Sequence, residues 1–346
     1  MKNILLFFGG ASSEYAVSLK SASAIIKAID REKFNLYLVG ITKEGKWYLY
    51  NGDIDLIADD KWQIDSNKKC FISMENDKCL SVINDDNIEN IHIDLAFPVL
   101  HGKNGEDGTI QGLLKLAGIP IVGCDIYSSA ICMDKEFSHI LVESKVKDIA
   151  KTPFVVLDSI SEYEEKLSDI KKLGYPMYVK PSKGGSSIGI TKVKEEDELL
   201  PSIKEAFNYD NKVIIEAHID GIEIGVSVMG NKNLVVGEVD AIKLDCDFFG
   251  YEEKYVTLKS EFILPAPFPE EVLNNIKKLG LESYKALGCS GFARVDLFYG
   301  SDKKIYFNEI NTIPGFTFNS RFPRMLKHKG YTFEEIVDYL IKESLN

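Results

Sequence analysis

The segment 291–321 constrains this chain most, because it places four polar side chains in what otherwise reads as a buried β-hairpin. Two runs rich in aromatic and apolar residues flank the turn sequence Gly-Ser-Asp-Lys, at 292–298 and 305–311. Because side chains alternate across a strand, Arg294 and Asp296 share one face, and Glu309 and Asn311 share one face of the partner strand. If the two faces coincide, all four groups meet, and burying them without partners would cost several kcal/mol.

Two interpretations fit this hairpin equally well. In the first, oxygens of Asp296, Glu309 and Asn311 hold Mg²⁺, which such sites share with substrate phosphates. Arg294 then supplies a fixed positive charge for an oxyanion or a phosphoryl group. In the second, Arg294 neutralises Asp296 or Glu309 and the set is structural. The sequence Asn-Thr-Ile-Pro-Gly at 311–315 favours the first, because this turn exposes backbone N–H groups beside the predicted ligands.

Length and charge exclude several classes of protein. The 346 residues exceed one simple core, so two or three domains are expected. A formal net charge of -12 argues against a nucleic-acid partner, which requires clustered cations. The six cysteines are scattered without a CxxC pair, as is typical of thiols in a reducing compartment, and no apolar run approaches bilayer-spanning length. We therefore expect a cytoplasmic protein with neither nucleic-acid nor membrane partners.

The first third of the chain reads as an open α/β layer. Apolar strands are predicted at 4–8, 34–41 and 94–100. A helix is predicted over 14–29, and another over about 109–117, whose N-terminus could hold an anion. Ligands bind at the carboxyl ends of strands in such layers, where the loops 9–14 and 101–108 lie. Residues 51–90 are polar and irregular and give no clear signal.

The middle of the chain contains a glycine- and serine-rich loop, KPSKGGSSIG, at 180–189. Consecutive backbone N–H groups in such a loop can cradle phosphate, and Lys135, Lys180 and Lys183 would add local cations. A mobile surface hairpin is at least as common a reason for such a loop, and the loop is not a P-loop. Strands and helices are predicted around it at 153–157, 177–180, 128–143 and 161–173.

The last part of the chain adds more strands and a long aromatic and charged loop. Strands are predicted at 213–217, 222–229 and 234–242, and helices at 270–287 and 332–345. Glu216 and Glu223 could bind sugar hydroxyls or could form a solvated strand face. The loop FFGYEEKY at 248–255 is typical of a lid or recognition loop.

The order of these motifs resembles that of the ATP-grasp D-alanine–D-alanine ligases, over essentially the whole chain. The motifs are GGASSEYAVS (9–18), HGKNGEDGTIQG (101–112), MDK (133–135), KPSKGGSSIG (180–189), EAHIDGIEIGV (216–226), YEEKY (251–255), GFARVD (291–296) and NEINTIPGFT (308–317). The resemblance implies an α/β ATP-grasp fold with three α/β domains: 1–124 on the first-substrate side, and 125–208 and 209–346 clasping ATP between their sheets. It also implies a homodimer.

The resemblance implies a reaction in which ATP phosphorylates the carboxylate of a first D-alanine, and the amine of a second substrate displaces the phosphate. Two Mg²⁺ (or Mn²⁺) would lie on Asp296, Glu309 and Asn311; whether a monovalent cation such as K⁺ assists stays open. By its motifs, the resemblance also assigns the contacts to ATP. Lys135 and Lys180 would contact the α- and β-phosphates, and the 184–187 backbone with Gly185 and Ser187 would cover the β- and γ-phosphates. Glu216 would lie beside the adenine, Glu223 would bind the ribose and Lys254 would reach the γ-phosphate.

The same resemblance assigns the amino-acid subsites. Glu14 would hold the first ammonium, His101 would orient its carboxylate, and Ser320 would receive the carboxylate of the second substrate. Arg294 and the Gly315 N–H would stabilise the tetrahedral oxyanion. Tyr255 would close the site by bonding to Glu14 and Ser186, and its transfer of the amine proton is a hypothesis. Taken singly, His101 is also typical of a structural histidine, and Ser320 of a helix N-cap.

Arg321 departs from the family's housekeeping enzymes, many of which have an apolar residue after the serine. In this position the chain looks like the vancomycin-resistance ligases, which place D-lactate or D-serine second. The pair Lys254-Tyr255 is unlike the D-lactate enzymes, which use a histidine there, so the resemblance predicts D-serine. D-Alanine–D-alanine ligation is the alternative. A non-catalytic ATP-grasp binding protein is a third, disfavoured because the metal ligands and Arg294 are all present.

Overall fold

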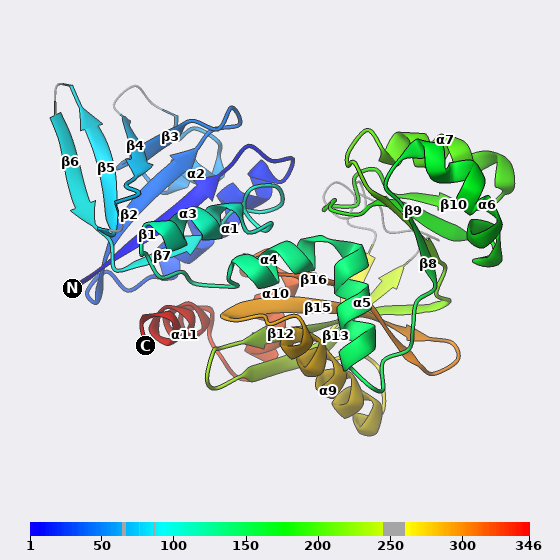
Figure 1. The fold of residues 1–346 in the computed structure, drawn as a ribbon. Helices are drawn as coiled ribbons and strands as arrows, with labels where there is room; N and C mark the ends of the chain where they lie inside the picture. The colour runs from blue at the N-terminus through cyan, green and yellow to red at the C-terminus, as the bar shows by residue number, and fades with distance from the viewer. Residues whose placement is uncertain (64–66, 76, 86, 245–259) are drawn as a thin grey trace.

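The computed structural model describes residues 1–63, 67–75, 77–85, 87–244 and 260–346. Its strands form three separate sheets of seven, four and five strands, which Figure 1 shows as distinct layers. Within these ranges, no helix is long and apolar enough to cross a membrane. The loop predicted at 248–255, with Lys254 and Tyr255, lies outside the described residues.

The first sheet has the strand order β6-β5-β4-β3-β2-β1-β7. Its parallel part consists of β1 (Lys2–Gly9), β2 (Phe34–Ile41) and β7 (Leu95–Pro98). Its antiparallel extension consists of β3 (Trp47–Tyr50), β4 (Lys68–Ile72), β5 (Cys79–Asn84) and β6 (Asn87–His92). The helices of this layer are α1 (Tyr15–Ala28), α2 (Asp55–Ala58) and α3 (Thr109–Leu116). Every residue from Ile4 to Phe8 is fully buried, which confirms the predicted strand covered on both faces.

The second sheet, in the order β10-β9-β11-β8, is antiparallel. Its strands are β8 (Phe154–Leu157), β9 (Met177–Pro181), β10 (Thr191–Val193) and β11 (Val213–Ala217). Its helices are η1 (Ile160–Glu162), α6 (Tyr163–Lys172) and α7 (Glu196–Ala206). The 182–190 loop joins β9 to β10, as the predicted hairpin requires, and it faces the other two layers.

The third sheet has the order β14-β13-β12-β15-β16 and contains the polar hairpin. Its strands are β12 (Gly221–Met229), β13 (Val235–Leu244), β14 (Ser260–Ile263), β15 (Phe292–Gly300) and β16 (Ile305–Asn311). Helix α9 (Glu270–Ala286) packs on β12, β13, β15 and β16, α10 (Arg321–His328) packs on β12 and β13, and α4 (Ile126–Met133) and α5 (Lys135–Lys145) pack on β16. Helix α11 (Phe333–Leu345) contacts α10 and reaches α1 and β7 of the first layer. The predicted hairpin strands are thus confirmed and extend slightly further.

The prediction of one continuous helix in the middle of the chain is wrong. The sequence predicted a single helix over 128–143, whereas α4 ends at Met133 and α5 begins at Lys135. Asp134 between them has an extended backbone, with φ -90° and ψ 107°. Its carboxylate accepts a hydrogen bond from the Ser182 hydroxyl at 2.9 Å and pairs with Lys212 at 2.6 Å. These partners, distant in the sequence, explain the break between α4 and α5, which no local sequence pattern predicts.

The largest apolar core joins the first layer to the end of the chain. Phe97 of β7 meets Phe292 of β15 at 6.1 Å between ring centroids, and Phe316 lies 5.6 Å from both Phe292 and Phe333. Figure 1 shows the resulting arrangement, with α11 in red close to the blue first layer, where it contacts α1 and β7. The second sheet has its own separate core. The first and third sheets therefore form a joint body to which the second sheet is attached.

Candidate functional site

The hairpin strands bring the four predicted polar groups to one place. In the antiparallel register of β15 and β16, Arg294 is opposite Asn311 and Asp296 is opposite Glu309. Opposite residues of an antiparallel pair project to the same face, so the two polar faces coincide. All four side chains line one pocket between the three layers.

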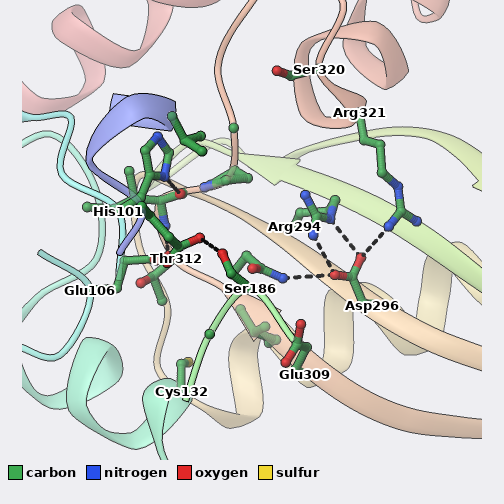
Figure 2. Close-up of a pocket in the computed structure, with 18 of the residues that line it drawn as sticks. His101, Glu106, Cys132, Ser186, Arg294, Asp296, Glu309, Thr312, Ser320 and Arg321 are labelled. Carbon is green, nitrogen blue, oxygen red and sulfur yellow. Dashed lines mark hydrogen bonds and ion pairs between the residues drawn. The ribbon is translucent and has the colours of Figure 1, made fainter. Parts of the chain in front are cut away.

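Asp296 is the most enclosed member of this set, with 2% of its side chain exposed. Arg294 donates two hydrogen bonds to its carboxylate, each 2.7 Å long, and Asn311 donates a third at 2.8 Å (Figure 2). The Arg321 guanidinium lies 3.5 Å from the same carboxylate. The ion pair expected from the structural interpretation of the hairpin is therefore present.

The residues also fit a hard cation in their chemistry. Among the described residues, no group of three or more histidine, cysteine or acidic side chains is placed to hold a metal ion. The hairpin, however, offers two carboxylates and an amide oxygen in one pocket, and these are donors that Mg²⁺ takes when phosphate and water complete its shell. Glu309 lies 3.4 Å from the Lys135 ammonium and is more exposed than Asp296, at 27% against 2%. A cation bound here would have to compete with Arg294 for Asp296.

The turn after β16 is fixed by the first layer. The imidazole of His101, fully enclosed, donates from Nδ1 to the Ile313 carbonyl over 2.7 Å, while its Nε2 lies 3.1 Å from the Ser21 hydroxyl. Burial lowers the pKa of His101, so the ring is neutral near neutral pH. The Ser21 hydroxyl also accepts the Phe316 N–H at 3.1 Å. His101 thus anchors the turn that contains Gly315, as the structural interpretation of this residue expects, while its role toward a substrate carboxylate stays a prediction.

Glu106 is a site residue that sequence reasoning missed. Its carboxylate accepts the Gly102 N–H at 2.8 Å and the Ile313 N–H at 3.0 Å, and it lines the same pocket. Burial, together with the Glu14 carboxylate, raises the pKa of Glu106 to about 8. The only signal was its position in the 101–108 loop, which had been singled out as a whole.

Glu14 and Ser186 meet across the pocket from different layers. The hydroxyl of Ser186, which Figure 2 labels, donates a hydrogen bond to Glu14. Ser186 and Ser187 have left-handed backbones, with φ of 53° and 58°, which turns the loop toward the first layer. A Cβ on Gly185 would lie 3.1 Å from Glu14 Oε2, so the glycine permits this close approach. The contact closes one side of the pocket.

A second cavity adjoins the first and is lined by most of the residues predicted for ATP. It contains Lys135, Lys180, Gly185, Ser187, Glu216 and Glu223. The Lys180 ammonium pairs with Glu216 at 2.5 Å, and the Lys135 ammonium donates to the Gly184 carbonyl at 2.8 Å. Burial opposes ionisation of Glu216, but Lys180 and His139 hold its pKa far below its ordinary value. Lys183 lies apart, with its ammonium 3.2 Å from the Asn211 side chain.

Ser320 and Arg321 lie at the start of α10 and point in different directions (Figure 2). Ser320 is the N-cap residue, yet its hydroxyl does not cap the helix and instead accepts the Thr317 N–H at 3.0 Å. Arg321 donates two hydrogen bonds to Asp240, at 2.8 and 2.9 Å, and one to Glu223 at 3.0 Å. Asp240 was not singled out in the sequence, because one aspartate in a strand carries no distinguishing pattern.

The described site residues thus fall into two adjoining cavities. The first collects Glu14, His101, Lys135, Ser186, Glu223, Arg294, Asp296, Glu309, Asn311, Gly315, Ser320 and Arg321. Lys135 and Glu223 line both cavities and mark the boundary between them. Lys254 and Tyr255 cannot be placed in either cavity, since they lie outside the described part of the chain.

Known proteins and family models match this chain over nearly its whole length. The family model described as "D-ala D-ala ligase N-terminus" matches residues 3–124, and "D-ala D-ala ligase C-terminus" matches residues 144–342. A "D-alanine--D-alanine ligase" of Caldicellulosiruptor bescii is 43% identical over 98% of this chain and 93% of that protein. The "Vancomycin B-type resistance protein VanB" of Enterococcus faecalis is also 43% identical, over 98% of this chain and 97% of that protein.

A solved structure is similar in fold as well as in sequence. The crystal structure of the VanG D-Ala:D-Ser ligase from Enterococcus faecalis has a TM-score of 0.92 and 45% identity, and the match covers 99% of each chain.

Proposed function

The chain belongs to the D-alanine–D-alanine ligase family, whose members are ATP-dependent peptide ligases with the ATP-grasp fold, and from that premise we propose that it joins D-alanine to D-serine through an acyl phosphate. The observation that carries the proposal is the first cavity, where Arg294, Asp296, Glu309 and Asn311 face the 184–187 loop and Glu14. The dipeptide would enter peptidoglycan precursors, and a D-serine terminus would connect the enzyme to vancomycin resistance.

Phosphorylation of the first substrate requires neutralisation of the phosphate charge. Asp296, Glu309 and Asn311 would hold Mg²⁺, which when bound offsets the negative charge of the β- and γ-phosphates. Lys135, which lines both cavities, and Lys180, which lines the second, add fixed positive charge. A carboxylate is a poor electrophile, so converting it to an acyl phosphate supplies the leaving group that the amine can displace.

The acyl-transfer step requires a partner for the oxyanion. Arg294 is placed to supply it, since it lies in the pocket beside the turn that bears the Gly315 N–H. Glu14 would bind the first ammonium from the opposite wall, where Ser186 already orients its carboxylate. Exclusion of water protects the acyl phosphate, and the Glu14–Ser186 contact closes that side of the pocket.

The choice of D-serine rests on Arg321 and on its surroundings. The guanidinium is engaged by Asp240 and Glu223, and its central carbon lies 5.7 Å from the centroid of the Phe262 ring, which also lines the pocket. With its donors directed at carboxylates, Arg321 would act on the acceptor by fixing the position of Phe262 and of the pocket wall. The likeness to a structure named as a D-Ala:D-Ser ligase supports the same choice.

The test is an acceptor panel of D-serine, D-alanine and D-lactate with D-alanine and ATP, read by ADP release and mass spectrometry of the product. We expect kcat/KM to favour D-serine, and Arg321→Leu to reduce the D-serine to D-alanine ratio by about tenfold. Asp240→Asn, which leaves the arginine but weakens its anchor, should move the ratio in the same direction.

A wild-type preference for D-alanine would instead identify a D-alanine–D-alanine ligase, the alternative that the 43% identity to the Caldicellulosiruptor bescii enzyme favours. Absence of ADP release with any acceptor would contradict the ligase activity itself.

A further inference from the structure

Behind the nucleotide-side cavity lies a buried histidine that the proposed mechanism does not use. His139 of α5 has none of its side chain exposed. Its Nδ1 lies 3.5 Å from Glu143 and its Nε2 lies 3.4 Å from Glu216. Among the described residues, neither ring nitrogen makes a hydrogen bond of good geometry, so the imidazole is held by charge and packing.

The imidazole lies among side chains from five elements, its own helix included, and few of these side chains are charged. Glu143 comes from its own helix, Glu216 from β11 and Lys180 from β9, whereas β8 and β16 contribute the uncharged rings of Phe154 and Phe307, at 5.7 and 5.2 Å between centroids. The result is a row of alternating charge: Glu143, His139, Glu216 and Lys180. Burial opposes a charge on His139, but Glu143 and Glu216 outweigh it and raise the pKa of this histidine.

We propose that His139 is a positioning residue for the nucleotide, and that its protonated form fixes the Glu216 carboxylate at the wall of the base-binding cavity. Glu216 is then held from both sides, by His139 at Oε1 and by Lys180 at Oε2. This inference rests on the proposed function, which places adenine beside Glu216. It adds that the affinity for the nucleotide depends on one proton, bound to a residue that the nucleotide does not touch.

The direction of this dependence follows from Lys180, whose charge disfavours a proton on His139. A nucleotide phosphate at Lys180 would offset that charge, so binding should raise the pKa of His139. Because linkage is reciprocal, the protonated protein must then bind nucleotide more tightly by the same factor. The affinity for the nucleotide is therefore highest below the pKa that His139 has in the free protein. It falls as the pH rises through the pKa that His139 has in the complex.

The experiment titrates the five histidines of the full-length protein by NMR, with and without saturating ADP, from about pH 5 to about pH 9. His139→Gln identifies the resonance. Calorimetry measures the dissociation constant of ADP over the same range. We expect ADP to raise the pKa of His139 and its affinity to fall about fivefold or more across the titration. The wild-type NMR shift tests the proposal even if the variant does not fold.

Glu143→Gln is the matched control, because Glu143 lines neither cavity and a glutamine oxygen can still accept the Thr152 N–H that Glu143 accepts at 2.8 Å. It should lower the pKa of His139 and shift the fall in affinity to lower pH, with both plateaus retained. His139→Gln should bind ADP with only the pH dependence of the nucleotide's own phosphates. A purely structural His139 would instead leave the pH profile of the variant like that of the wild type.

The outcomes separate the two proposals. An unchanged or lowered pKa of His139 on ADP binding, or an affinity that ignores its protonation, would overturn this inference and leave the ligase proposal intact. Failure of ADP to bind at any pH would overturn both.

Discussion

At the scale of single residues, the pocket is dominated by the ion pairs of Asp296. Alternation along the two strands was enough to predict that this carboxylate would meet Arg294, Glu309 and Asn311. The sequence did not indicate that Arg321, beyond the hairpin, would approach within 3.5 Å. That approach depends on how α10 packs against β12 and β13, which the interpretation of Ser320 as a helix N-cap did not indicate. Local patterns identify the members of such a cluster, while tertiary packing decides which of them pair.

Asp296 is almost fully buried and Glu309 is partly exposed, and two matched substitutions test what this difference in burial means for stability. Asp296→Asn should lower the free energy of unfolding by about 3 kcal/mol, because it removes the carboxylate that pairs with the largely buried guanidinium of Arg294, whereas Arg321 keeps Asp240 and Glu223. Glu309→Gln, at a more exposed position, should cost less than about 1 kcal/mol. Both variants should lose most ligase activity if both carboxylates hold the metal. Urea denaturation and ADP release measure the two effects, and equal losses of stability would contradict the assigned ion pairs.

At the scale of elements, the junction of α4 and α5 positions Lys135 at the boundary of the two cavities. The apolar pattern from 128 to 143 suits one helix, so the break at Asp134 could not be predicted from it. The break results from contacts with Ser182 and Lys212, which are distant in sequence. It also lets the Lys135 N–H donate to the Ser182 carbonyl at 3.0 Å, which ties the start of α5 to the glycine-rich loop.

Asp134→Asn tests whether this junction serves the nucleotide. The amide can still accept from Ser182 but no longer pairs with Lys212, so we expect a loss of about 2 kcal/mol in stability. The KM for ATP should rise several-fold while the KM for D-alanine stays near the wild-type value, because the change lies on the nucleotide side. Glu136→Gln, which removes the other carboxylate from Lys212 at 2.7 Å, is the control for a pure charge effect. Parallel increases in both KM values would argue against the assignment.

At the scale of the whole molecule, several strands and the hairpin were readable from the sequence, whereas the order of the strands in each sheet and the shared core were not. The hydrophobic runs at 4–8 and 34–41 and the 292–311 hairpin have strong local signals, and the structure confirms them as strands. Strand pieces were expected within 51–90, but the bounds and pairing of the antiparallel extension from β3 to β6 were not predicted, because its short strands are only partly buried and lack clear alternation. The division at 124 and 208 stays a prediction, and β11 pairs with β8 and β9 although it follows the second boundary.

Phe316→Ala tests the joint core of the first and third layers. The ring is 1% exposed and packs against Phe292, Phe322 and Phe333, so its removal should cost about 3–5 kcal/mol. Hydrogen exchange should increase in both α1 and α11, which belong to this core. Ile203→Ala, a buried truncation in the second sheet's own core, should increase exchange in that layer alone. Uniform increases in both variants would indicate one undivided cooperative unit.

The contacts from His101 and Glu106 to Ile313 join positions 212 and 207 residues apart in the chain. A ribosome makes residue 313 only 212 residues after His101, long after the first sheet has left the exit tunnel. The nascent polypeptide therefore contains His101 and Glu106 without their partner until the turn with Ile313 has been synthesised. A product released before that turn would lack the partner of His101 and also α11, which contacts α1 and β7 in the joint core, so premature termination should yield a first layer with an exposed apolar face.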